Sequence, residues 1–166
     1  TATITEILTA FTLQFDQQVS EELRQGFQRQ GLDLYQAVTL ASIVQREAMV
    51  ADEQPMIASV FYNRLRKPMK LDSDPTVQYA VGYNTPQKTW WTNPLSSKDL
   101  KVDSPYNTYT RIGLPPGPIA SPGLSALRAV AYPAQSPYFY FQAKCDKSGM
   151  HAFAVTYAEH LNNICP

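Results

Sequence analysis

Apolar residues recur at spacings of three and four through the first part of the chain, a pattern that predicts amphipathic helices. Gly31 is placed to end the first of these helices. Its apolar stripe consists of Ile4, Leu8, Phe11, Phe15, Val19, Leu23 and Phe27. Such a pattern is typical of a helix that packs one face on a core and solvates the other, so we assign it no chemistry.

A second helix is predicted from about Asp33 to Met49, with an apolar stripe formed by Leu40, Ile43 and Val44. The next position on that stripe is Glu47. Burying an ionised carboxylate is costly unless a cation pairs with it. Three interpretations follow: Glu47 pairs with Arg64 or Arg66 of the next helix, the stripe reaches solvent at Glu47, or Glu47 keeps its proton to a higher pH.

A third helix is predicted to follow closely, with Asp52 as its cap and Pro55 in its first turn. Its inner face is formed by Ile57, Val60, Phe61 and Leu65. Asn63 lies on or beside that face, and a polar amide there needs partners. Those partners are either backbone groups or a ligand, and the spacing favours a structural use.

Prolines divide the chain, because eleven of the thirteen lie between Lys67 and Pro137. Residues 71–123 show little periodicity, and an ordered loop region of this length usually builds a site. Aromatic rings alternate there with amides and hydroxyls, a mixture that suits sugars and also lines protein interfaces. The aromatic residues are Tyr79, Tyr83, Trp90, Trp91, Tyr106 and Tyr109.

The last part of the chain predicts a short helix, a β-hairpin and a closing helix. Ser121 is expected to cap the short helix that precedes the hairpin, with Pro122 at the first position of that helix. Aromatic and apolar runs at residues 138–144 and 150–156 flank a polar turn, which predicts the hairpin. Thr156 and Glu159 form a capping box for the last helix. Helices first and antiparallel strands late indicate an α+β fold.

Charge and composition exclude several classes of protein. Lys and Arg together number 14, as do Asp and Glu, so the net charge is zero and the basic stripe of a nucleic-acid binder is missing. With 44% hydrophobic residues a packed core is expected. The longest apolar runs are far shorter than the roughly 20 residues that cross a bilayer. A signal or membrane anchor is therefore expected only upstream of Thr1.

The two cysteines, Cys145 and Cys165, allow a disulfide that joins the end of the chain to the hairpin turn, or two free thiols. A disulfide would suit an extracytoplasmic protein. Zinc binding with His151 and His160 lacks any C-x-x-C or H-x-x-x-H pair, so we expect no metal and no cofactor. His151 is best read as a packing or hydrogen-bonding residue with a role in substrate contact.

Several segments, in this order, resemble the endolytic murein transglycosylases of the YceG-like (MltG) family. They are ASIVQREA (41–48), ASVFYNRL (58–65), LDSDPTVQYA (71–80), DSPYNTY (103–109), GLPPGPIASPG (113–123), YFYF (138–141) and GMHAF (149–153). The most specific pair is YNTY with GLPPGPI. The resemblance implies that residues 1–166 are one YceG-like catalytic domain fragment, whose first 30 residues link to a LysM-like domain outside this sequence.

The family's catalytic acid lies in a segment that aligns with SIVQREA, so the resemblance implies Glu47 as the catalytic residue. The first family glutamate is replaced by Gln45, which lies about 200° around the helix axis from Glu47, towards the polar side. For substrate binding we expect the segment Tyr106, Asn107, Thr108 and Tyr109. Orienting roles are expected for Asn63, Ser73, Asp74 and Thr76, and His151 completes the set.

The activity implied is lytic cleavage of MurNAc–GlcNAc bonds in peptidoglycan, with one Glu as acid and then base and a 1,6-anhydro product. Two alternatives stay open. One is a muramidase-type hydrolase in which Asp72 or Asp74 assists water, and the other is a catalytically silent binding or scaffolding domain, which the Gln45 departure favours. Expected partners are glycan strands and cell-wall synthesis proteins, with no nucleic acid. The expected location is the extracytoplasmic face of the bacterial inner membrane.

Overall fold

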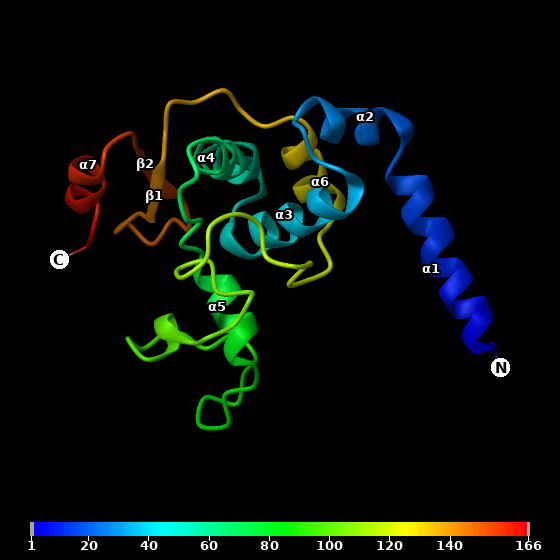
Figure 1. Ribbon diagram of the computed structural model, residues 1–166, viewed down its shortest axis with the longest axis horizontal. Coiled ribbons are helices and arrows are strands. Elements are labelled where there is room, and N and C mark those ends of the chain that lie inside the picture. The colour runs from blue at the N-terminus through cyan, green and yellow to red at the C-terminus, as the bar shows by residue number, and fades with distance from the viewer. Residues whose placement is uncertain (1, 166) are drawn as a thin grey trace.

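The computed structural model describes residues 2–165 and confirms the α+β fold (Figure 1). The helices are α1 (Ile4–Gln18), α2 (Glu21–Arg29), α3 (Leu34–Glu47), α4 (Gln54–Arg66), α5 (Asp74–Val81), α6 (Leu124–Ala131) and α7 (Tyr157–Asn162). Two strands, β1 (Tyr140–Ala143) and β2 (His151–Ala154), form an antiparallel hairpin. Short 3₁₀ turns lie at Ala51–Glu53 and Asp99–Lys101. No helix within residues 2–165 has the length and apolar character needed to cross a membrane.

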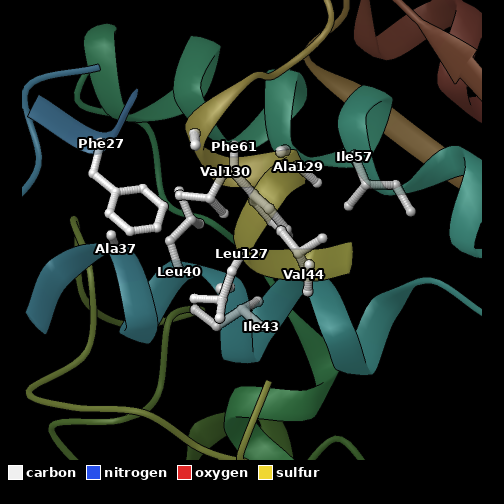
Figure 2. Packing of buried hydrophobic residues seen from close by; sticks show 14 of the residues in the cluster. Phe27, Ala37, Leu40, Ile43, Val44, Ile57, Phe61, Leu127, Ala129 and Val130 are labelled. Atoms are coloured by element: carbon white, nitrogen blue, oxygen red, sulfur yellow. The ribbon is translucent and has the colours of Figure 1, made fainter. Parts of the chain in front are cut away.

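The hydrophobic core lies where α2, α3, α4 and α6 meet (Figure 2). Side chains from all four helices are fully buried there, and they include Phe27, Leu40, Ile43, Val44, Ile57, Phe61, Leu127 and Val130. The predicted inner faces of the second and third helices are thus confirmed. Because α3 runs through this core, its last residue, Glu47, is carried by a rigid element.

The predicted long first helix is wrong, because the chain breaks at Val19 and Ser20 into α1 and α2. The Ser20 hydroxyl accepts a hydrogen bond from Leu23 N and starts a new helix. Only the α2 half of the stripe, with Val19, joins the core. The α1 half is exposed, since Ile4 and Phe11 are 78% and 71% accessible, and Figure 1 shows α1 extending away from the other helices.

Three other helix starts differ from the sequence prediction. Asp52 lies in the 3₁₀ turn, and α4 begins after Glu53, which makes no capping bond. Helix α6 begins after Gly123 rather than after Ser121. The unperiodic loop region contains a helix, α5, which begins at Asp74 with Pro75 in its first turn. Ser73 followed by Asp-Pro is a signal for the start of a helix. A helix of eight residues is too short to show a clear apolar periodicity, so the sequence pattern did not reveal it.

The C-terminal predictions are confirmed. Strand pairing places Phe141 opposite Phe153, and the Thr156–Glu159 capping box forms both of its hydrogen bonds. Of the two alternatives that the sequence left open for Cys145 and Cys165, the structure has the disulfide, which ties the end of the chain to the hairpin turn. Helix α7 buries none of its residues and packs on β1 and β2, so this covalent bond holds it beside the hairpin.

A test of this packing is the close crossing of α2 and α6 at Gly26. A Cβ added there would lie 2.7 Å from Ala131 Cβ and 3.3 Å from its carbonyl oxygen. We expect Gly26→Ala to destabilise the fold by about 1–3 kcal/mol, because overpacking outweighs the gain in helix propensity. Chemical denaturation measures this change. Gln28→Ala, at an exposed position of the same helix, is the matched control, and an equally stable Gly26→Ala would refute the tight crossing.

Candidate active site

Glu47 is the last residue of α3, at the end of its buried stripe. Its side chain is partly buried, and desolvation raises the pKa of the carboxyl from 4.5 to about 7. The nearby Asp74 charge adds to this rise, whereas the Ser73 hydrogen bond and the Arg64 charge oppose it. Glu47 forms no ion pair with Arg64 or Arg66 in the part of the chain described. Of the three interpretations, the retained proton is the one this geometry supports.

The direct partner of Glu47 is Ser73, whose hydroxyl donates to Glu47 Oε1 over 2.5 Å. Ser73 occupies the N-cap position of α5, yet its side chain makes no capping bond. The hydroxyl that would usually cap the helix is instead turned to the carboxyl group. A donor of this kind favours the ionised form of Glu47.

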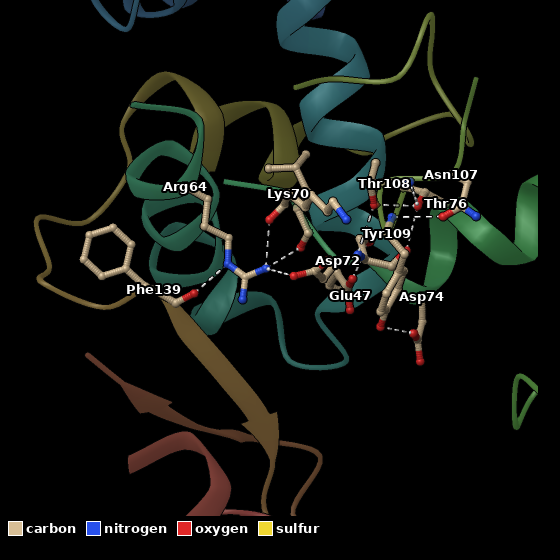
Figure 3. A network of polar contacts seen from close by, with 12 residues as sticks. Glu47, Arg64, Lys70, Asp72, Asp74, Thr76, Asn107, Thr108, Tyr109 and Phe139 are labelled. Atoms are coloured by element: carbon tan, nitrogen blue, oxygen red, sulfur yellow. Dashed lines mark hydrogen bonds and ion pairs between the residues drawn. The ribbon is translucent and has the colours of Figure 1, made fainter. Parts of the chain in front are cut away.

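A buried polar network holds Ser73 in place (Figure 3). The Thr108 hydroxyl accepts from Ser73 N over 3.1 Å and lies 2.8 Å from the Thr76 hydroxyl, which in turn donates to the Ser73 carbonyl over 2.7 Å. Asn107, which is fully buried, donates to the carbonyls of Leu100 and Val102. These residues therefore connect the YNTY segment to the hydroxyl that contacts Glu47.

Arg64 of α4 lies on the opposite side of Glu47 from Tyr109 in Figure 3. Its guanidinium donates to the carbonyls of Lys70, Leu71 and Phe139 and to Asp72 Oδ2, at 2.6–3.1 Å. The side chain is 9% exposed. One buried cation thus ties α4, the segment before α5 and the strand region together around the carboxyl group.

Tyr109 donates its hydroxyl to Asp74 Oδ1 over 2.6 Å. Burial and this hydrogen bond raise the pKa of Tyr109, so the phenol stays neutral. Tyr106, by contrast, packs its ring on Tyr79 at a centroid distance of 4.7 Å. The two tyrosines of the YNTY segment thus face different surroundings.

Glu47 opens into a cavity of about 530 Å³. One wall comes from the segment around α5, and the other from the hairpin and α7. The residues that line it are Glu47, Arg64, Leu71, Asp72, Asp74, Tyr109, Tyr140, Phe141, Gln142, Ala143, His151, Tyr157 and His160. Acidic groups therefore gather beside α5, and imidazole and aromatic rings gather on the hairpin side.

The structure divides the predicted site residues into three groups. Those that line the cavity are Glu47, Asp74, Tyr109 and His151. Those buried behind its wall, with their polar atoms bonded inside the protein, are Ser73, Thr76, Asn107 and Thr108. Tyr106 and Asn63 lie away from it. The Asn63 amide donates to the carbonyls of Ser136 and Tyr138, which is the structural use that its spacing favoured.

Apart from His151, sequence reasoning missed the hairpin side of the cavity. Tyr140, Tyr157 and His160 line it although no pattern singled them out. The rings of Tyr140 and His160 stack at a centroid distance of 5.4 Å. The aromatic run YFYF was the one available signal, and it predicted a strand without showing which face would meet Glu47.

Two further observations bear on the candidate chemistry. The Gln45 side chain accepts from Gly123 N over 2.9 Å, so it contacts the start of α6 and is not among the residues that line the cavity. Within residues 2–165, no group of three or more His, Cys, Asp or Glu side chains is arranged to hold a metal ion.

The chain matches a known family of proteins. A model of the YceG-like family matches residues 1–165, and the chain belongs to that family. The endolytic murein transglycosylase of Bacillus subtilis (strain 168) is 40% identical over 140 residues, which cover 84% of this chain and 36% of that protein. The protein of the same name from Streptococcus pneumoniae serotype 2 (strain D39 / NCTC 7466) is 33% identical over 133 residues, covering 80% and 24%.

A solved structure is also similar. The crystal structure of a YceG-like protein from Listeria monocytogenes matches with a TM-score of 0.74 and 43% sequence identity, over 84% of this chain and 43% of that one. The chain thus spans less than half the length of each of these relatives. The predicted family is confirmed by these matches.

The raised pKa of Glu47 predicts a pH-dependent stability. The unfolded carboxyl ionises near pH 4.5 and the folded one near 7, so the folded state binds the extra proton between these values. The free energy of unfolding should therefore fall by about 3 kcal/mol as the pH rises from 4.5 to 7, at roughly 1.4 kcal/mol per pKa unit. Above pH 7 it should level off.

Glu47→Gln removes this titration. Relative to the parent, the variant should gain stability across that pH range and keep the gain above pH 7. Urea denaturation at a series of pH values measures the difference. Glu21→Gln, at an exposed position of α2, is the control. A difference in unfolding free energy between Glu47→Gln and the parent that stays constant from pH 4.5 to 8 would contradict the burial of Glu47.

Proposed function

We propose that this chain carries the active site of a peptidoglycan lytic transglycosylase, with Glu47 as its catalytic residue. The observation that carries the proposal is the Glu47 carboxyl group, which opens into a cavity with its pKa raised to about 7. Such a group is a proton donor near neutral pH. The relatives named endolytic murein transglycosylase support murein as the substrate.

In the proposed reaction, Glu47 first donates its proton to the glycosidic oxygen between MurNAc and GlcNAc. The bond from the anomeric carbon to that oxygen breaks, and the C6 hydroxyl oxygen of the same MurNAc bonds to the anomeric carbon. Glu47, now a carboxylate, accepts the proton that this hydroxyl loses. The product is a 1,6-anhydro sugar, the enzyme returns to its starting state, and no water is consumed.

A residue that acts first as an acid and then as a base must both release and accept a proton, so its pKa should lie near the operating pH. Burial and Asp74 favour the protonated form of Glu47, whereas Ser73 and Arg64 favour the ionised form. The Ser73 hydroxyl is thus a donor to the carboxylate that exists after the first proton transfer. Thr76 and Thr108 act as positioning residues because they hold Ser73. Asn107 positions the segment that carries Thr108, through its bonds to the carbonyls of Leu100 and Val102.

Contacts to the glycan are assigned to the side chains that line the cavity. Tyr109 and Asp74 provide the wall beside Glu47, and the hairpin side adds aromatic faces suited to sugar rings. The expected substrate-binding role of Tyr106 stays a prediction, as does the orienting role of Asn63. This activity would place the protein at the bacterial cell envelope, with glycan strands as its partner.

A second candidate reaction is hydrolysis, because Asp72 and Asp74 also line the cavity. In a muramidase one of them would assist a water molecule. Asp72 is engaged with Arg64 and Asp74 with Tyr109, which favours a structural use for both. Hydrolysis leaves a reducing end, whereas the lytic reaction leaves an anhydro end lighter by one water.

The test is digestion of purified peptidoglycan by the parent chain and by Glu47→Gln, with mass analysis of the fragments. We expect anhydro ends from the parent and a loss of at least about 100-fold in rate for the variant, the usual worth of a general acid. Glu22→Gln, at an exposed position of α2, should cleave as the parent does. Reducing ends would favour the muramidase, unchanged turnover would remove Glu47 from the mechanism, and no cleavage by the parent would favour a binding domain.

A further inference from the structure

A buried carboxylate and a histidine meet at the hairpin side of the cavity. Glu53, in the turn before α4, has a side chain only 8% exposed, and His151, the first residue of β2, has one 9% exposed. Glu53 Oε2 lies 2.8 Å from His151 Nδ1, and both carboxylate oxygens accept from the backbone N–H of His151 at 2.9 and 3.1 Å. All the hydrogen bonds that this carboxylate makes within residues 2–165 go to one histidine.

This contact decides which ring nitrogen carries the hydrogen. An acceptor at 2.8 Å from Nδ1 requires a hydrogen on that atom, which leaves the lone pair of a neutral imidazole on Nε2. The ring plane is fixed as well, because Phe141 packs edge-on against it at a centroid distance of 5.4 Å. Glu53 therefore sets both the tautomer and the orientation of His151.

The second ring nitrogen is free for a ligand. Nε2 makes no hydrogen bond within residues 2–165, and His151 lines the cavity into which Glu47 opens. A neutral imidazole with its lone pair at Nε2 accepts a hydrogen bond but does not donate one there. It can thus bind a hydroxyl group, whereas a carboxylate, which also only accepts, finds no partner at that atom.

We propose that His151 Nε2 accepts a hydrogen bond from a hydroxyl of the glycan in the cavity, with Glu53 as the positioning residue. The inference rests on the proposed function, since it takes a glycan as the ligand. Hydroxyls are the donors that a polysaccharide presents most densely. In this arrangement the hairpin holds the sugar from the side opposite α5, while Glu47 acts on the glycosidic bond.

The first test reads the tautomer directly. The ¹⁵N shifts of His151 in the whole chain should show a hydrogen on Nδ1 and none on Nε2 at a pH where the ring is neutral. In Glu53→Gln the amide can donate to Nδ1, which moves the hydrogen to Nε2. Asp52→Asn, an exposed carboxylate one residue away, is the matched control and should leave the ring signals unchanged.

The second test reads activity. Glu53→Gln should lower kcat/KM for glycan cleavage by about 10-fold, because the hydrogen bond from the sugar hydroxyl to Nε2 is lost. His151→Asn keeps a donor near the Nδ1 position and lacks Nε2, so it should show a similar loss. Because it leaves Glu53 intact, it decides the matter if Glu53→Gln does not fold. Asp52→Asn should cleave as the parent does.

A hydrogen on Nε2 of neutral His151 in the parent would overturn the proposal, as would parental kcat/KM in both His151→Asn and a folded Glu53→Gln. Failure of the proposed function is distinguished by adding soluble, stem-free glycan strands to the Glu47→Gln variant. A shift of the Nε2 signal supports the hydroxyl contact even if the parent cleaves no glycan, and no shift at saturating glycan contradicts it.

Discussion

The site depends on how the protein partly buries one carboxyl group without pairing it with a cation. Glu47 ends a helix whose preceding turns are packed in the core, so the backbone that carries the side chain is held in place. Burial then raises its pKa to about 7, while the Ser73 hydroxyl limits the rise. Ser73 and Arg64, which lower the pKa of Glu47, are themselves held by other contacts. Much of the surrounding structure therefore contributes to the pKa of this one carboxyl group.

The two walls of the cavity contribute differently. The α5 side is a polar network in which Thr108, Thr76 and Ser73 bond one another and leave Glu47 a single donor. The hairpin side consists of rings, with His151 fixed by Glu53 and α7 held near by the Cys145–Cys165 disulfide. We infer that the α5 side supports the acid–base chemistry of Glu47, and that the hairpin side provides contacts to the sugar.

Local patterns predicted what is local. The inner faces of α3 and α4, the hairpin and the last capping box follow from spacing and capping rules, and Glu47 emerged because a carboxylate interrupted an apolar stripe. The long-range contacts of the site could not be predicted from local patterns. Ser73 lies 26 residues from Glu47 along the chain, and Glu53 lies 98 residues from His151. Periodicity also failed for α1, because it shows which face is apolar and not whether anything covers it.

The most direct measurement of the central claim is the pKa of Glu47 itself. The side-chain carboxyl can be followed by ¹³C NMR across a pH titration, with Glu47→Gln used to assign its signal. The account predicts a midpoint at a pH of about 7. A midpoint near 4.5 would show a solvated carboxylate and would contradict the account.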